Sequence, residues 1–222
     1  MIVFPNSKIN LGLHILRKRP DGYHDLETVF YPLTLTDVLE IIPLGSHESS
    51  TPLLFTVSGA ELQGSPSSNL CVRAFELLKK DFPNLPAVKM HLHKTIPSGA
   101  GLGGGSADAA FTLQLLNKMF SLGIPTTQLF VYANELGSDC PFFIINKPCY
   151  ATGRGEMLAE VQLDLSAYQV VLVYPGIHID TGLAFKNITA AMPEKSVKEI
   201  ILRPIEKWKD ELHNDFEKVI FE

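Results

Sequence analysis

The stretch from Lys94 to Ala110, KTIPSGAGLGGGSADAA, carries the clearest chemical signal in the sequence. Five of the seven residues from 99 to 105 are glycine, so the segment has almost no side chains to fill space. An alternating apolar segment before it predicts a strand, and apolar positions at helical spacing after it predict a helix. A loop of small residues that leads into a helix presents unpaired backbone N–H groups and the positive end of the helix dipole. The stretch therefore predicts an anion site, most often a phosphate site.

Two other glycine-rich motifs share features with this loop. The spacing G-x-G-x-x-G at 99–104 fits the dinucleotide fingerprint, but no acidic residue lies between Asp108 and Glu135 to hold a ribose. The Walker pattern fails because no Gly-Lys-Ser/Thr follows the glycines. The remaining alternative is a turn that only packs a strand against a helix, with Ser106 as a plain N-cap. Ordering five glycines costs much chain entropy, and a simple turn would not require so many of them.

Lys8 and Asp139 could take part in chemistry, although each also has an ordinary explanation. Lys8 lies on the polar face of an alternating segment, where a lysine is usually just solvated. Asp139 stands between a predicted helix and an apolar run, where an aspartate often caps a turn. His91 and His93 share one face of a predicted strand, which is one interpretation of a metal pair, but no third ligand is suggested nearby.

Tyr23 and His24 leave a Pro-Asp-Gly turn together. On the sequence alone they could equally be an exposed aromatic residue and a neutral surface histidine. Asn69 stands before an amphipathic segment, and N-capping alone explains an asparagine there.

Apolar periodicity predicts the elements that must position these residues. We expect a strand or pair of strands over 2–17, interrupted near Pro5, and further strands at 38–43, 53–58, 88–93, 141–145 and 168–174. We expect helices at 70–78, 107–120, 126–136, 181–187 and 196–222.

Four motifs in this order and spacing resemble the GHMP kinases. They are PNSKINL at 5–11, RPDGYH at 19–24, PSGAGLGGGSADAA at 97–110 and GSDCPFF at 137–143. Together they resemble the group of that family whose substrate carries a cytidine diphosphate, and the match runs from residue 2 to about residue 187.

The resemblance implies an α+β, two-domain GHMP kinase fold. We expect an N-terminal ATP-binding domain of the ribosomal-protein-S5-domain-2-like type over 1–152 and a ferredoxin-like substrate-binding domain over 153–222. Members of the family continue for several dozen residues with another glycine-rich segment, whereas no glycine follows Gly182 here. We therefore expect the second domain to be incomplete.

The resemblance also implies roles for individual residues. Lys8 and Asp139 would be catalytic, with the lysine beside the hydroxyl that receives the phosphate. Contacts with ATP would come from Asn69, near the adenine, and from Pro97, Gly99, Ala100, Gly101, Leu102, Gly103, Gly104, Gly105 and Ser106. The Ser106 hydroxyl would also reach Mg²⁺. The substrate would meet Asn10, Tyr23, His24, Thr181 and Phe185, with Tyr23 and Phe185 on the two faces of the cytosine and His24 at its edge.

Composition agrees with an ordinary globular protein of 222 residues, 45% hydrophobic and 19% charged. A formal net charge of −5 without a basic tract argues against nucleic acid as a partner. The start lacks the pattern of a signal peptide, and no apolar run is long enough for a membrane span. Three cysteines without metal spacing favour a reduced, cytoplasmic setting. We expect a monomer or weak homodimer.

The function that the resemblance implies is ATP-dependent phosphorylation of an alcohol group on a small cytidine diphosphate compound, in isoprenoid precursor biosynthesis. Two alternatives stay open. One is another GHMP small-molecule kinase of the homoserine or mevalonate type. The other is a non-catalytic nucleotide-binding fragment, which would have no need for Lys8 and Asp139 together.

Overall fold

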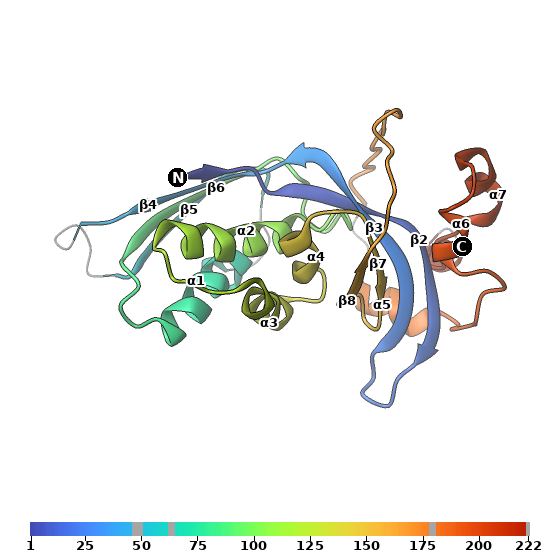
Figure 1. Cartoon of the computed structure of the whole chain (residues 1–222), viewed down its shortest axis with the longest axis horizontal. Helices are drawn as coiled ribbons and strands as arrows, with labels where there is room; N and C mark the ends of the chain where they lie inside the picture. Colours follow the sequence, from blue (N-terminus) through green and yellow to red (C-terminus); the bar gives the residue numbers. More distant parts are fainter. Residues whose placement is uncertain (46–50, 62–64, 178–180, 221–222) are drawn as a thin grey trace. The chain divides into compact units, whose positions relative to one another are not determined.

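The computed structural model describes residues 1–45, 51–61, 65–177 and 181–220. The chain folds into two compact units, shown in Figure 1, and neither is continuous in sequence. The first comprises 1–8 and 32–146, and the second 9–31 and 147–222. Both β2 (Asn6–Lys18) and β3 (His24–Thr36) contribute residues to each unit. The domain division near residue 152 stays a prediction, because units defined by packing need not coincide with domains defined by what they bind.

The first unit contains a four-stranded sheet. Its strands are ordered β1 (Ile2–Val3), β4 (Val38–Pro43), β6 (Val88–Lys94) and β5 (Leu53–Gly59), close to the predicted ranges. Strand β6 pairs antiparallel with β4 and parallel with β5. Alternate residues of β6 are buried, as the period of two predicts.

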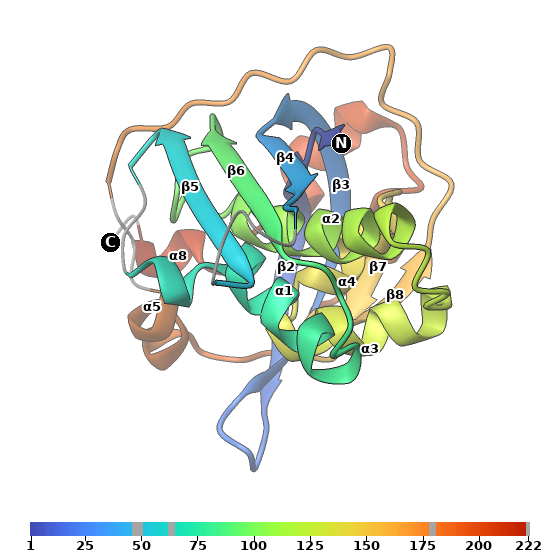
Figure 2. The same ribbon diagram turned by 90° about the vertical axis from the view of Figure 1, so that its left-hand side faces the viewer.

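Helices cover one face of this sheet, and Figures 1 and 2 both show α1 and α2 on the same side of it. The α-helices described in this unit are α1 (Leu70–Asp81), α2 (Gly104–Met119), α3 (Thr126–Leu136) and α4 (Cys140–Ile145). Helices α1 and α2 contact the sheet, and α2 also contacts the other three helices. The first three confirm the predicted helices. Because β6 leads to the glycine loop and α2 leaves it, this packing fixes both ends of the loop.

The prediction of a buried strand at 141–145 is wrong, because these residues form helix α4. The run is fully buried except for its last residue, so it has no polar face whose period could distinguish helix from strand. Two local signals do favour a helix. Pro141 lies in the first turn, where its missing N–H costs nothing, and Asn146 ends the helix in the left-handed conformation at φ 54°.

The second unit contains a sheet ordered β2, β3, β7 (Cys149–Thr152) and β8 (Met157–Glu160). Val29 of β3 packs in a cluster with residues of α6 (Val197–Ile200) and with Trp208. Leu26, three residues earlier, packs in a second cluster together with Phe185 of α5 (Thr181–Asn187). Side chains three apart on a strand point to opposite faces, so β3 contributes to a core on each of its faces.

Two predictions for the second unit need correction. The strand expected at 168–174 is not formed: within the described residues no strand pairs with this segment, and β-propensity alone does not order a strand that lacks hydrogen-bonding partners. The helix expected over 196–222 is instead four short pieces: α6, η2 (Ile205–Lys207), α7 (Trp208–Glu211) and α8 (Glu217–Ile220). Pro204, which has no N–H and restricts the residue before it, separates α6 from η2.

No helix in the described part of the chain combines the length and apolar character needed to span a bilayer. Cys71, Cys140 and Cys149 are buried and form no disulfide.

Candidate active site

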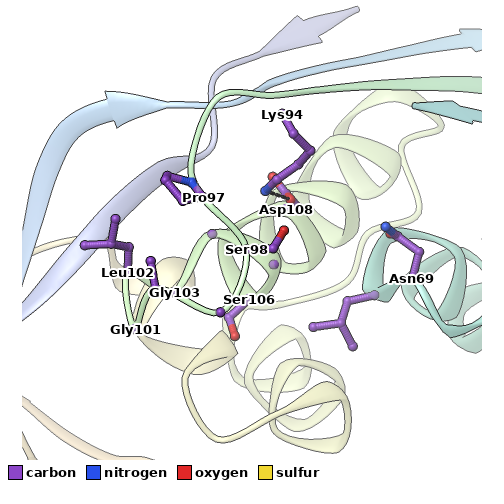
Figure 3. Close-up of a pocket in the computed structure, with 14 residues that line it drawn as sticks. Asn69, Lys94, Pro97, Ser98, Gly101, Leu102, Gly103, Ser106 and Asp108 are labelled. Atoms are coloured by element: carbon purple, nitrogen blue, oxygen red, sulfur yellow. Dashed lines mark hydrogen bonds and ion pairs between the residues drawn. The ribbon is translucent and has the colours of Figure 1, made fainter. Parts of the chain in front are cut away.

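The glycine loop forms the wall of a pocket of about 290 Å³ in the first unit. Figure 3 shows this pocket between the loop, the end of β6 and the start of α1. All ten residues expected to contact a nucleotide line it, together with four others that were not predicted: Leu70, Lys94, Ser98 and Asp108. The volume is just below the range of about 300–1,000 Å³ that is typical of small-molecule sites.

The backbone of the loop is arranged as an anion site requires. Within the described residues, the N–H groups of residues 101–106 donate no hydrogen bond to the protein. Helix α2 begins at Gly104, so the N–H groups of residues 104–106 belong to the helix start and share its positive dipole end. The alternative of Ser106 as N-cap is wrong, because the N-cap is Gly103 and Ser106 is the third residue of the helix.

Gly103 is required by both its backbone and its neighbours. Its φ is +70°, in the left-handed region that side chains disfavour. A Cβ placed there would lie 2.9 Å from Cζ of Phe143 and 3.0 Å from Cγ of Lys8. The stem of Lys8 therefore runs across the loop at the position where a side chain is missing. The backbone N–H of Lys8 also donates to the Leu102 carbonyl at 2.9 Å, which ties the strand to the loop.

The Lys8 ammonium lies 3.2 Å from Oδ2 of Asp139. The lysine side chain is 6% exposed and the aspartate 32%, so the pair has a buried cation and a carboxylate that reaches solvent. Asp139 stands at the N-cap position of α4, yet its side chain makes no capping hydrogen bond. Both ordinary explanations therefore fail, since Lys8 is not a solvated lysine and the Asp139 carboxylate does not cap the helix.

Hydrogen bonds of the two residues just before Lys8 fix the start of β2. The Ser7 hydroxyl donates to the carbonyl of Leu35 at 3.0 Å. The Asn146 amide, just after α4, donates to Oδ1 of Asn6 at 2.8 Å. These bonds hold the strand that carries Lys8 next to the helix that follows Asp139.

A buried ionic cluster lies at the base of the pocket. Lys94 donates to Asp108 of α2 at 2.8 Å and to Asp37, and all three side chains are at most 3% exposed. Figure 3 shows the Lys94–Asp108 bond. Asp37 also accepts hydrogen bonds from the backbone N–H groups of Thr95 and Ile96, at 2.6 and 2.8 Å. The cluster therefore joins the end of β6, where the loop begins, to the first turns of α2, where it ends.

Burial raises the pKa of Asp108 to about 7, and the nearby Asp37 carboxylate adds to the rise although Lys94 opposes it. Burial would lower the pKa of Lys94, but the two carboxylates outweigh it and the pKa is raised. Oδ1 of Asp108 has no hydrogen-bond partner among the described residues. Sequence reasoning missed this cluster, although a single acidic residue among the alanines of SADAA was a usable signal.

Asn69 combines two features. Its Oδ1 accepts a hydrogen bond from the Cys71 backbone N–H at 2.9 Å, so it caps α1, as the ordinary explanation holds. It also lines the pocket.

The residues expected to bind the substrate lie in the second unit. The rings of His24 and Phe185 stack with centroids 5.3 Å apart and an interplanar angle of 21°. Tyr23 is 56% exposed, and the guanidinium of Arg154 lies over its ring. Asn10 is half-buried on β2. Thr181 begins α5, but its side chain falls outside the part that the structure describes.

The two histidines that could form a metal pair make hydrogen bonds to the neighbouring strand. His91 and His93 do share a face of β6, where their rings hydrogen-bond to hydroxyls of β5: Thr56 contacts His91 at 2.8 Å, and Ser58 contacts both rings at 2.9 Å. In the part of the chain that is described, no group of three His, Cys, Asp or Glu side chains could hold a metal ion.

Comparison with known proteins agrees with this geometry. Residues 69–147 match the model of the GHMP kinases N terminal domain. Proteins named 4-diphosphocytidyl-2-C-methyl-D-erythritol kinase from Bacteroides fragilis and Bacteroides thetaiotaomicron are 53% and 51% identical over 221 residues, covering all of this chain and 80% of theirs. A crystal structure of 4-(cytidine 5'-diphospho)-2C-methyl-D-erythritol kinase is similar over the whole chain and 77% of its own, with a TM-score of 0.79 and 30% identity.

Proposed function

Since this chain belongs to the GHMP kinase family, among its 4-diphosphocytidyl-2-C-methyl-D-erythritol kinases, we propose that it phosphorylates the 2-hydroxyl of that compound with ATP. The reaction belongs to non-mevalonate isoprenoid precursor biosynthesis. The observation that carries the proposal is the Lys8–Asp139 pair at 3.2 Å, with the Lys8 stem packed against the glycine loop.

Phosphoryl transfer depends on alignment and on compensation of charge, because the protein has little covalent chemistry to perform. The substrate oxygen would form a bond to the γ-phosphorus while the bond to the β,γ-bridging oxygen breaks and ADP leaves. Asp139 would orient the hydroxyl and accept its proton late in the reaction. Lys8 would offset charge on the transferred group, which it can do strongly because it is almost fully buried.

The pocket supports a site for ATP. The N–H groups of residues 101–106 would bind its phosphates, since none of them is used within the described protein. Asn69 would lie near the adenine together with Pro97. Its side-chain oxygen caps α1, so the amide nitrogen is the atom that it can offer to the base.

A magnesium ion would enter together with ATP. Mg²⁺ prefers oxygen ligands and is usually held by one or two protein groups plus substrate phosphates. Ser106 lines the pocket at the helix start, and its hydroxyl is a ligand of the required type. The ion would supply further compensation for the phosphate charge. The roles proposed for Lys8 and Asp139 depend on where their own side chains lie and not on this ion.

In the second unit, Tyr23, His24 and Phe185 would bind the cytosine of the substrate. Flat aromatic side chains accept any base by stacking, and the exposed ring of Tyr23 offers such a face. The His24–Phe185 stack supports a compact aromatic site. We also propose that Asn10 and Thr181 contact the substrate and that the protein acts in the cytoplasm.

Measuring ATP consumption with the purified chain tests this function. We expect turnover with 4-diphosphocytidyl-2-C-methyl-D-erythritol and none with homoserine or mevalonate. The Asp139→Asn variant serves as the matched inactive control. Turnover with homoserine or mevalonate would favour another GHMP kinase, and nucleotide binding without any turnover would favour a non-catalytic role.

A further inference from the structure

Arg154 has a position in the second unit that the proposed reaction leaves unexplained. Its Cζ lies 4.8 Å from the centroid of the Tyr23 ring, which is itself 56% exposed. A guanidinium is only weakly attracted to an exposed aromatic face, so this contact does not by itself account for an arginine there.

The other arginines around Tyr23 are neutralised by aspartates. Arg17 binds Asp25 at 2.5 Å, and Arg19 binds Asp25 at 2.9 Å and Asp21 at 3.0 Å. The guanidinium of Arg154 forms no ion pair with a carboxylate of the described residues. Its charge is felt nearby, because it adds to the effect of Arg19 in lowering the pKa of Asp21. Arg154 is therefore a cation next to Tyr23 that is not bonded to an acid of the described chain.

The backbone holds Arg154 in place. It lies in the turn between β7 and β8, and β7 pairs with β3. The neighbouring carbonyl of Gly153 accepts a hydrogen bond from the Leu26 N–H of β3 at 2.8 Å. The N–H of Arg154 donates to Oε2 of Glu156 at 2.6 Å, so that carboxylate is bound to the backbone of the turn. The turn is thus anchored to the strand that follows Tyr23, which presents the cation and the aromatic ring together.

We infer that Arg154 binds the diphosphate of the substrate while its base occupies the aromatic site at Tyr23, an inference that rests on the proposed function. A guanidinium matches phosphate oxygens with two parallel N–H groups, which a lysine cannot reproduce. The protein as a whole is acidic, so it needs placed cations to attract a diphosphate. Arg154 supplies that charge beside the aromatic face.

The alternative is that Arg154 only supports the Tyr23 ring. The two possibilities differ in what they predict for ligands with and without phosphate groups. If Arg154 only supports the ring, its loss would weaken the binding of cytidine and of cytidine diphosphate equally, because both present the same base. If Arg154 binds the diphosphate, its loss would weaken the binding of cytidine diphosphate alone.

Isothermal titration of the whole chain with cytidine and with cytidine diphosphate tests the inference. In the Arg154→Leu variant, which keeps an apolar stem over Tyr23, we expect affinity for cytidine diphosphate to fall about 10-fold or more. We expect affinity for cytidine to stay within about 2-fold, and Arg154→Lys to restore part of the loss. Arg17→Leu removes the same charge from a residue that is 77% exposed, and it should leave the ratio of the two affinities unchanged.

An equal loss of affinity for both ligands in Arg154→Leu, or an unchanged affinity for cytidine diphosphate, would overturn the inference and leave the proposed function standing. Failure of the unaltered chain to bind either ligand would instead contradict the proposed cytidine site, and this inference with it.

Discussion

The ammonium group of Lys8 lies 3.2 Å from the carboxylate of Asp139, although 131 positions separate the two residues in the chain. Because the lysine is buried and the aspartate is partly open to solvent, the aspartate is the more accessible partner for a substrate hydroxyl. The pair also adjoins the glycine loop through the Lys8 stem. A change at Asp139 can therefore be tested separately from nucleotide binding, whereas a change at Lys8 also alters its contact with the loop.

Replacing Asp139 by Asn should lower kcat by about 100-fold or more, the scale of a lost general base. ATP affinity, measured by titration, should change little, because the phosphates would be held by backbone N–H groups. Unchanged turnover in this variant would remove Asp139 from the mechanism.

Gly103→Ala should lower both stability and activity. The left-handed backbone costs about 1–2 kcal/mol for a residue with a side chain, and the new methyl group would displace Lys8 and Phe143. Gly123→Ala is the matched control, since Gly123 has a φ of +69° and open space around its Cβ position. Denaturant unfolding and steady-state kinetics should show similar backbone strain in both variants, with loss of kcat only at position 103. Equal activity in the two would argue against the packing of Lys8 on the loop.

The Asp108 carboxyl should make stability fall as the pH rises. Its pKa is about 7 in the folded protein and about 4 when unfolded, so the folded state binds more protons between these values. The free energy of unfolding should therefore decrease from about pH 4 to about pH 7. Asp108→Asn should flatten this part of the profile in denaturant titrations, whereas Glu135→Gln, an exposed change on α3, should preserve it. A profile that is the same in Asp108→Asn would contradict the raised pKa.

Tyr23→Ala should raise the KM for the cytidine diphosphate substrate by about 10-fold, as expected for a lost stacking partner. Hydrolysis of ATP without substrate should not change. Tyr168→Ala removes another exposed tyrosine from the same unit and is the control. If Tyr23→Ala altered both activities to the same extent, stacking would not explain its role.

The sequence predicts most of the first unit, because its helices α1 and α3 and its strand β6 have clear apolar periods and ends. It fails at α4, where burial on all sides leaves no period to detect. It fails again at 168–174, because pairing with another strand is a tertiary property. The Lys94 cluster was missed for a similar reason: Asp37 is 57 residues away from Lys94, and only the folded sheet brings them together. The glycine loop at the start of α2 was predictable because it depends on backbone conformation, which glycine reports directly.

A crystal structure of the chain with a non-hydrolysable ATP analogue would show whether the glycine loop holds the phosphates next to Lys8 and Asp139. We expect phosphate oxygens about 2.7–3.2 Å from backbone nitrogens within residues 101–106, with the terminal phosphate beside Nζ of Lys8. Phosphates bound away from this loop, or a terminal phosphate remote from both Lys8 and Asp139, would contradict it.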